Sequence, residues 1–229
     1  MKNIKVLALN ISEILPKPDK WFYYLCPSRA KKAQRYLRLN DCARCVAAGL
    51  LLAYSSAKAT NTLKQEIVET RYSNNKPRLK NMSGFHFNIS HSADWVVCAS
   101  SDIELGVDIE KISDDLSTVA QKYYCSSELE MISTLPANQA HRMRYNLWTI
   151  KESIMKASGM GFKLPPQQIC VLSTNPVKTQ ITSQQKNYTT QLTNFQDDYS
   201  LAMSAREKFS YCLSIKTISE ISEFLSNRF

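Results

Sequence analysis

The chain has 229 residues and a formal net charge of +9, with 44% of the residues hydrophobic and 21% charged. This balance excludes an intrinsically disordered or collagen-like chain, and the length suits one large domain or two halves of about 110 residues. The longest apolar run, residues 46–54, is about half of the roughly 20 residues that a membrane-spanning helix needs. The first ten residues hold two lysines and a short apolar stretch, too short for a signal peptide. We therefore expect a cytoplasmic protein with no membrane partner.

Cysteine usage points the same way. The seven cysteines are odd in number and scattered through core-like sequence, which does not suit a disulfide scaffold. Cys42 and Cys45 form a C-x-x-C pair, but no second pair or nearby histidine supplies the four ligands of a zinc site. We expect free thiols.

Positive charge is concentrated early in the chain and negative charge near its middle. Residues 20–44 hold seven basic side chains and one acidic one, whereas residues 102–115 hold six acidic side chains and one lysine. A site that transfers phosphoryl groups with a metal ion needs both, since carboxylates hold Mg²⁺ and cations hold phosphates. An ordinary solvated surface would explain the same charges.

Hydrophobic patterning predicts the elements in chain order. A strand is expected over 4–11, a basic helix over 27–38 that breaks at Asn40, and a core helix from Asp41, its N-cap, to about residue 59. Arg44 lies in the first turn of that core helix, where a phosphate could bind. Two strands follow within 85–99, joined around 92–94, and then a strand over 104–110 and helices over 116–124, from 126 or 127, and over 145–158. Segments 94–99 and 198–203 are both a turn followed by a strand, which leaves an internal duplication open.

The strand over 104–110 carries paired acids. Its apolar residues alternate with Gly106, Asp108 and Glu110, so two carboxylates project from one face beside a glycine that leaves room for a ligand. Adjacent like charges cost energy unless a cation joins them. A metal pair and a plain exposed face are both open at this point.

The helix over 145–158 presents a mixed stripe. At 100° per residue, Trp148, Glu152, Lys156 and Gly159 fall close together, and Lys151 lies near the other edge. The stripe offers a carboxylate and an amine, although a simple surface pair at i, i+4 has the same spacing.

Four strings, in this order, resemble the signature of the Sfp-type 4′-phosphopantetheinyl transferases: Asn75-Lys76-Pro77, FNISHS at 87–92, GVDIE at 106–110, and Trp148-x-x-Lys151-Glu152-x-x-x-Lys156. The likeness runs from about residue 20 to 170. It implies an α+β fold of two similar halves, 1–110 and 111–229, related by a pseudo-twofold axis, with the site at their junction. Each half would be a small, mostly antiparallel sheet packed with helices. Such an axis would account for the similarity between segments 94–99 and 198–203.

The resemblance implies an enzyme that transfers the 4′-phosphopantetheine arm of coenzyme A to a serine of an apo acyl or peptidyl carrier protein. The reaction releases 3′,5′-ADP and depends on Mg²⁺. Because carrier proteins are generally acidic, a basic partner suits them. We expect a monomer that binds no nucleic acid. The alternative is a non-catalytic module that binds a nucleotide or nucleic acid, to which the basic first third would also be suited.

Catalytic and metal roles carry over by position. The resemblance assigns Asp108, Glu110 and Glu152 to Mg²⁺, Lys156 to the attacked phosphate, and Lys151 to its support. For the proton of the attacking serine it leaves three candidates: Glu128, Glu152 and a metal-bound hydroxide. The carrier protein would dock on the segment after Glu110, with Tyr123 and Tyr124 as candidate contacts that could equally be core residues.

Binding roles for coenzyme A carry over to six residues: Arg29, Lys32, Arg44, Lys76, Ser90 and His91. Two departures from the family pattern stand beside them. Cys45 replaces a frequent threonine, which removes one hydroxyl that could contact phosphate. Asn75 replaces the usual glycine before Lys-Pro, although asparagine tolerates the same turn conformation.

Overall fold

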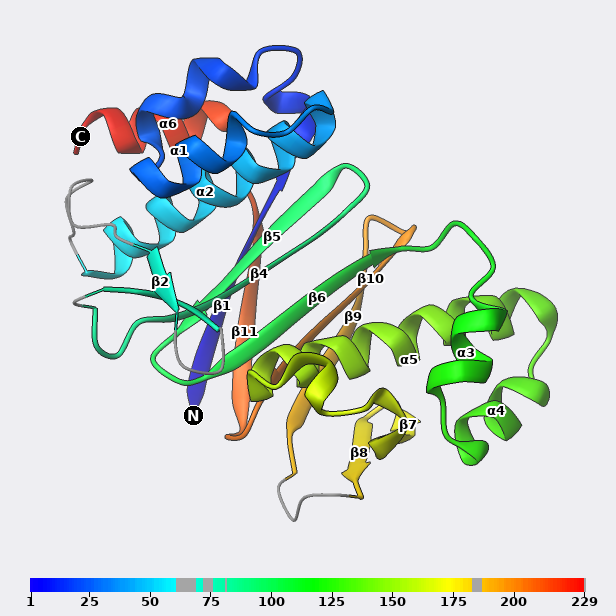
Figure 1. Ribbon diagram of the computed structural model, residues 1–229. Coiled ribbons are helices and arrows are strands. Elements are labelled where there is room, and N and C mark those ends of the chain that lie inside the picture. Colours follow the sequence, from blue (N-terminus) through cyan, green and yellow to red (C-terminus); the bar gives the residue numbers. More distant parts are fainter. Residues whose placement is uncertain (61–68, 72–75, 81, 183–186, 229) are drawn as a thin grey trace. The chain divides into compact units, whose positions relative to one another are not determined.

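The computed structural model describes residues 1–60, 69–71, 76–80, 82–182 and 187–228 (Figure 1). The chain divides into two compact units: Met1–Ile103 with Ser210–Phe229, and Glu104–Phe209. This division differs from the expected halves 1–110 and 111–229. Strand β6 (Leu105–Lys111) pairs within the second unit, and the C-terminal segment returns to the first. The boundary follows strand pairing, which chain order alone does not reveal.

The first unit is a four-stranded sheet covered by helices. The sheet has the order β11-β1-β5-β4, with β1 antiparallel to β5 and β5 antiparallel to β4. Its strands are β1 (Lys2–Asn10), β4 (His86–Ser92), β5 (Trp95–Ser101) and β11 (Phe209–Ile215). Its helices and short ribbon are η1 (Ile11–Glu13), η2 (Pro18–Tyr24), α1 (Pro27–Ala33), α2 (Leu39–Thr60), α6 (Ile218–Ser226), β2 (Glu69–Arg71) and β3 (Pro77–Leu79).

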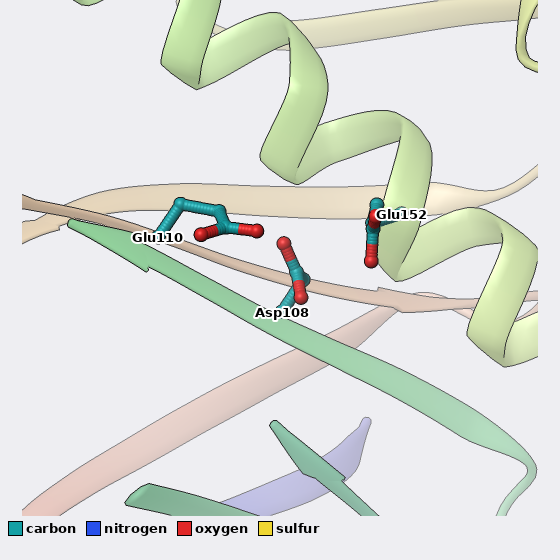
Figure 2. A group of neighbouring side chains, drawn as sticks. All are labelled: Asp108, Glu110 and Glu152. Carbon is teal, nitrogen blue, oxygen red and sulfur yellow. The ribbon is translucent and has the colours of Figure 1, made fainter. Parts of the chain in front are cut away.

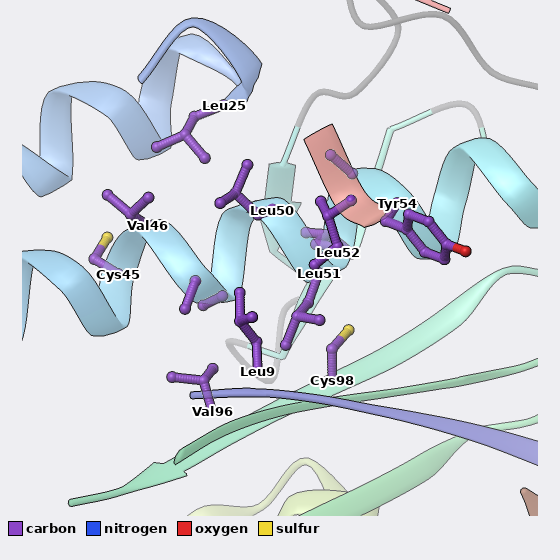
Figure 3. Packing of buried hydrophobic residues seen from close by; sticks show 14 of the residues in the cluster. Leu9, Leu25, Cys45, Val46, Leu50, Leu51, Leu52, Tyr54, Val96 and Cys98 are labelled. Carbon is purple, nitrogen blue, oxygen red and sulfur yellow. The ribbon is translucent and has the colours of Figure 1, made fainter. Parts of the chain in front are cut away.

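Helix α2 forms the centre of this unit's core. Its apolar side chains, among them Leu50 and Leu51, are fully buried against Leu9 of β1 and against Val96 and Cys98 of β5 (Figure 3). Burial of a large aliphatic side chain stabilises a fold by about 1.5–3 kcal/mol, so this contact holds the helix on the sheet.

The helix boundaries between 27 and 41 were predicted wrongly. Helix α1 ends at Ala33 rather than at 38, and α2 begins at Leu39, so Asn40 lies inside a helix. Asp41 is in the first turn and is not the N-cap, because the N–H groups of Asp41 and Cys42 already donate to the carbonyl of Arg38 at 3.1 Å.

The second unit repeats the plan with a three-stranded sheet. Its order is β6-β10-β9, and both pairings are antiparallel. The strands and helices are β6, β9 (Thr189–Phe195), β10 (Tyr199–Ala205), α3 (Ser117–Tyr123), α4 (Ser126–Ser133) and α5 (Ala137–Ser158). A separate ribbon, β7 (Ile169–Thr174) with β8 (Val177–Ile181), follows the short helices η4 (Gly161–Lys163) and η5 (Pro166–Gln168).

Each unit therefore contains a strand, a long helix and a hairpin in the same order. The hairpin turns are alike in detail, because Ile11 donates to the carbonyl of Asp94 at 2.8 Å and Ile112 donates to that of Asp198 at 2.7 Å. The α+β class with small antiparallel sheets packed by helices is confirmed. The axis between the halves stays a prediction. Within the described residues, no helix is long and apolar enough to cross a membrane.

Candidate active site

Three carboxylates meet in the second unit. Asp108 and Glu110 lie two residues apart on β6, so their side chains share one face of the strand, and Glu152 comes from α5 (Figure 2). One oxygen of each lies within 4.8 Å of the others. The structure thus brings together the three residues that the resemblance assigned to a metal ion.

Gly106 explains how the helix comes so close to the strand. A Cβ atom there would lie 2.1 Å from the carbonyl oxygen of Ser153 and 2.3 Å from the nitrogen of Ala157, both in the α5 backbone. The room beside the carboxylates, expected for a ligand, is filled by the helix. The glycine acts indirectly, since it lets α5 bring Glu152 to Asp108.

Lys156 is the counter-ion of the cluster. Its Nζ lies 2.5 Å from Asp108 Oδ1 and 3.7 Å from Glu152 Oε2. Burial alone would lower the pKa of Lys156, but the charges of Asp108 and Glu152 outweigh it and raise that pKa. Burial and the charge of Asp108 raise the pKa of Glu152 to about 7.

The cluster has the chemistry of a site for a hard divalent cation. Carboxylate oxygens are the ligands that Mg²⁺ and Ca²⁺ take in proteins. One ammonium against three carboxylates leaves excess negative charge, and the charge of Asp108 adds to burial in raising the pKa of Glu152. A divalent cation would remove that excess, so the residues fit such an ion.

Glu128 and Lys151 do not join this cluster. They form an ion pair of 2.9 Å, and both side chains are 0% exposed. The pair is held by four main-chain groups: the N–H groups of Cys125 and Val171 and the carbonyls of Pro166 and Ile169. Neither side chain is exposed to solvent, so the structure speaks against Glu128 as base and Lys151 as phosphate support. It places both in a buried network that ties α4, β7 and η5 to α5.

A cationic pocket lies in the first unit. It has a volume of about 440 Å³, and four residues expected to bind coenzyme A line it: Arg29, Lys32, Arg44 and His91. Cys45, which departs from the family pattern, lines it as well. These residues come from α1, α2 and β4, and both α1 and β4 contact α2.

Two of the pocket's cations are paired with acids. Arg44 donates to Asp41 Oδ1 at 2.6 Å and to the carbonyl of Ala93 at 2.8 Å. Arg29 makes two hydrogen bonds of 2.6 Å to Glu69. Glu69 was missed by sequence reasoning, because it lies 40 residues from its partner in a segment with no motif.

Two further residues expected to bind coenzyme A lie outside the pocket lining. Lys76 and Ser90 are 7% and 6% exposed, and of the described residues it is their neighbours Pro77 and His91 that line the pocket. Asn75 lies outside the described residues.

The candidate docking tyrosines differ from each other. Tyr124 is buried and donates to the carbonyl of Arg144, so it is a core residue. Tyr123 is half-buried and packs against Trp148 and against Phe162, which is 63% exposed. Tyr123 stays a candidate contact.

Two family models match the chain in succession. Residues 16–103 match the model described as "4′-phosphopantetheinyl transferase, N-terminal", and residues 104–204 match that of the "4′-phosphopantetheinyl transferase superfamily". Their common border coincides with the start of the second unit at Glu104.

Relatives carry the same name. The 4′-phosphopantetheinyl transferase gsp of Aneurinibacillus migulanus is 31% identical over 169 residues, covering 72% of this chain and 70% of that protein. A 4′-phosphopantetheinyl transferase of Bacillus subtilis is 29% identical, covering 64% of this chain and 66% of its own. The protein psf-1 of Bacillus pumilus is 30% identical, covering 56% and 55%. The chain thus spans just under two thirds of the Bacillus subtilis relative and about half of the Bacillus pumilus one.

A solved holo-(acyl-carrier-protein) synthase of Bacillus anthracis, in complex with CoA (3′,5′-ADP), shares 18% identity at a TM-score of 0.40 and covers 44% of this chain and 93% of that one. A likeness of that size has no bearing on function. The two family models and the relative from Aneurinibacillus migulanus show that the chain belongs to the 4′-phosphopantetheinyl transferase superfamily.

Proposed function

We propose that this protein transfers the 4′-phosphopantetheine arm of coenzyme A to a serine hydroxyl of an apo acyl or peptidyl carrier protein and releases 3′,5′-ADP. The observation that carries the proposal is the cluster of Asp108, Glu110 and Glu152, with Lys156 bonded to Asp108, in a member of this superfamily. A cation site beside a lysine suits the transfer of a phosphoryl group, which depends on positioning and charge stabilisation.

The three carboxylates would hold Mg²⁺. When bound, the ion would neutralise charge on the pyrophosphate of coenzyme A. Asp108 and Glu110 are set by the alternation of β6, and Glu152 is set by the close packing of α5, so the three ligands are preorganised on two rigid elements.

Lys156 supplies the positive charge nearest to the cluster. The Lys156 side chain is 28% exposed, so its ammonium group can turn from Asp108 toward a phosphate oxygen and stabilise charge in the transition state. Of the two carboxylates considered as acceptors of the serine proton, Glu152 lies in the cluster and Glu128 is buried in its own ion pair. We assign the proton acceptor to Glu152.

The pocket of the first unit would take the nucleotide end of coenzyme A. Arg29, Lys32 and Arg44 offer cations to a phosphate, and His91 adds a ring nitrogen at the wall. Lys76 and Ser90 are buried beside lining residues, so we assign them to the support of the wall.

The carrier protein would be drawn by charge. A net charge of +9 attracts an acidic partner, and the attraction weakens as salt screens it. We propose a monomer that acts on carrier proteins and not on nucleic acid. We place it in the cytoplasm, because all seven cysteines are described and none forms a disulfide.

Mass spectrometry tests the function. Apo acyl and peptidyl carrier proteins are incubated with the enzyme, coenzyme A and Mg²⁺, and with an EDTA control. We expect a mass gain equal to that of the phosphopantetheine arm on at least one carrier, lost with EDTA. No gain on any carrier, together with tight binding of an oligonucleotide, would favour the non-catalytic module.

A further inference from the structure

Arg29 of the cationic pocket already holds an anion that belongs to the chain. Its Nε donates to Glu69 Oε1 and its Nη2 to Glu69 Oε2, each at 2.6 Å. This two-point contact has the geometry with which a guanidinium group binds either a carboxylate or a phosphate. Both side chains also line the pocket. An internal carboxylate therefore occupies a position suited to a phosphate of the ligand.

Local packing holds Arg29 at that position. A Cβ atom on Gly49 of α2 would lie 2.5 Å from Arg29 Cδ, so the glycine makes room for the arginine stem against the helix. The Arg29 and Glu69 side chains are 13% and 17% exposed, and Cys26 Sγ donates to Glu69 Oε1 at 3.2 Å. The guanidinium cannot leave the wall easily, but the carboxylate sits on a short ribbon that pairs through three residues of β2.

Glu69 is charged at neutral pH. Burial alone would raise its pKa, but the hydrogen bonds and charge of Arg29 outweigh burial and lower that pKa. A ligand phosphate that approaches Arg29 thus meets a carboxylate of like charge at the same two donor groups.

We propose that Glu69 determines the affinity and specificity of the pocket, as an internal anion that a phosphate monoester of the ligand must displace from Arg29. The identity of the ligand rests on the proposed function. In coenzyme A the 3′-phosphate is the one phosphate monoester, so Glu69 reduces the advantage of coenzyme A over 3′-dephospho-coenzyme A. Of the other lining residues, Asp41 holds Arg44 by a single bond of 2.6 Å and keeps 37% of its side chain exposed, so it competes less.

The test compares Glu69→Gln with wild type by isothermal titration calorimetry, using coenzyme A, 3′-dephospho-coenzyme A and 3′,5′-ADP. Glutamine keeps the size of the side chain and removes its charge. We expect coenzyme A and 3′,5′-ADP to bind on the order of tenfold more tightly to the variant, as removal of one charge-assisted contact allows. Binding of 3′-dephospho-coenzyme A changes less than twofold.

Asp102→Asn is the matched control. Asp102 pairs with Lys2 on the surface of the same unit and is not among the residues that line the pocket. The substitution removes one negative charge without touching Arg29, so it leaves all three affinities unchanged. If it tightens the phosphate ligands as much as Glu69→Gln does, net charge is the cause and the proposal is overturned.

Two further measurements keep the proposal open to refutation. If Glu69→Gln folds poorly, Glu69→Asp keeps the charge but shortens the reach, and it should give affinities between those of wild type and glutamine. In thermal unfolding, 3′,5′-ADP should stabilise Glu69→Gln more than wild type, because the nucleotide supplies the anion that Arg29 lacks. Equal or weaker binding of coenzyme A by the variants would instead show that Glu69 orients Arg29 for the ligand.

The role of Glu69 in ligand binding and the transfer activity of the protein are tested by separate measurements. The binding of 3′,5′-ADP involves no group transfer, so tightening by Glu69→Gln would stand even if no carrier protein gained mass. Conversely, wild type could modify a carrier while Glu69→Gln left every affinity unchanged, and then the role of Glu69 alone would fall.

Discussion

The two units place different side chains at equivalent points of the same framework. In the first unit Asn10 of β1 pairs with Trp95, the residue after the hairpin turn. In the second, Lys111 of β6 pairs with Tyr199, which also follows its turn. The strands can therefore be aligned residue by residue from these pairs.

In this alignment Leu7 and Leu9 of β1 correspond to Asp108 and Glu110 of β6. Leu9 is fully buried under α2, and Leu7 packs at the margin of the same core. Asp108 is just as buried, at 1% exposure, but it carries a charge and needs Lys156. In the first unit, apolar side chains occupy this face of the strand and the same framework still folds. The carboxylates of β6 are therefore not required for folding. Their cost in desolvation indicates a function.

The largest expected effect is on activity in the second unit. Asp108→Asn removes one ligand charge and keeps the shape, and we expect the rate of transfer to fall on the order of 1,000-fold, since metal stabilisation of a transition state is worth several kcal/mol. Urea unfolding should show little loss of stability, because Lys156 keeps Glu152 as a partner and the cluster loses one of its excess negative charges. Asp102→Asn is the control, and an active Asp108→Asn enzyme would contradict the metal assignment.

The next effect is on the buried pair of Glu128, which the resemblance offered as a base, and Lys151, which it offered as a phosphate support. Glu128→Gln or Lys151→Met alone leaves one buried charge without its partner and should cost about 3–5 kcal/mol of unfolding free energy. The double variant should lose less than the sum of the two, which a urea double-mutant cycle measures.

Activity separates this role from catalysis. Per folded molecule, the double variant should keep the acid limb of the pH profile of transfer. If that limb disappears, Glu128 accepts a proton in the reaction after all, and its burial with Lys151 is relieved during turnover.

Local patterns predicted the two parts of the acidic cluster, and the family resemblance predicted that the parts meet. The alternation over 104–110 fixes which side chains of β6 share a face, and the i, i+4 spacing of Glu152 and Lys156 puts them on one stripe of α5. These signals lie within a few residues, where backbone geometry decides. The similarity between segments 94–99 and 198–203 was likewise visible in the sequence, and it corresponds to the hairpin turn that occurs in both units.

Contacts between distant segments could not be predicted. Arg29 meets Glu69 across 40 residues, and Lys151 meets Glu128 only because β7 and η5 fold back on α5. The break after Ala33 had no signal either, since residues 34–38 contain no glycine or proline. In these places tertiary packing, not local preference, sets the outcome.

At the aligned strand positions, a substitution in β1 should lower stability, whereas one in β6 should lower activity. Leu9→Ala removes a fully buried side chain from the core under α2, and we expect a loss of about 3 kcal/mol in unfolding free energy. Chemical denaturation measures it, and at a temperature where the variant is folded its transfer rate should match wild type. If the stability of the variant were unchanged, the contact between Leu9 of β1 and α2 would not contribute to the stability of the core.

The smallest effect concerns the pH dependence of stability in EDTA. The pKa of Glu152 is raised to about 7 in the folded protein, against about 4.3 for an unfolded chain. Between these values the native state binds more protons than the unfolded state, so the free energy of unfolding falls as pH rises and stays low above pH 7. Glu152→Gln abolishes this fall, so relative to wild type the variant gains stability between about pH 4.3 and 7. Mg²⁺ at alkaline pH should restore wild type and leave the variant unchanged, because the ion replaces the proton as the charge that the cluster needs. If the stability curves of wild type and variant ran parallel with and without Mg²⁺, Glu152 would lie outside any cation site. The two units would then differ in the charge that they bury and not in a metal site.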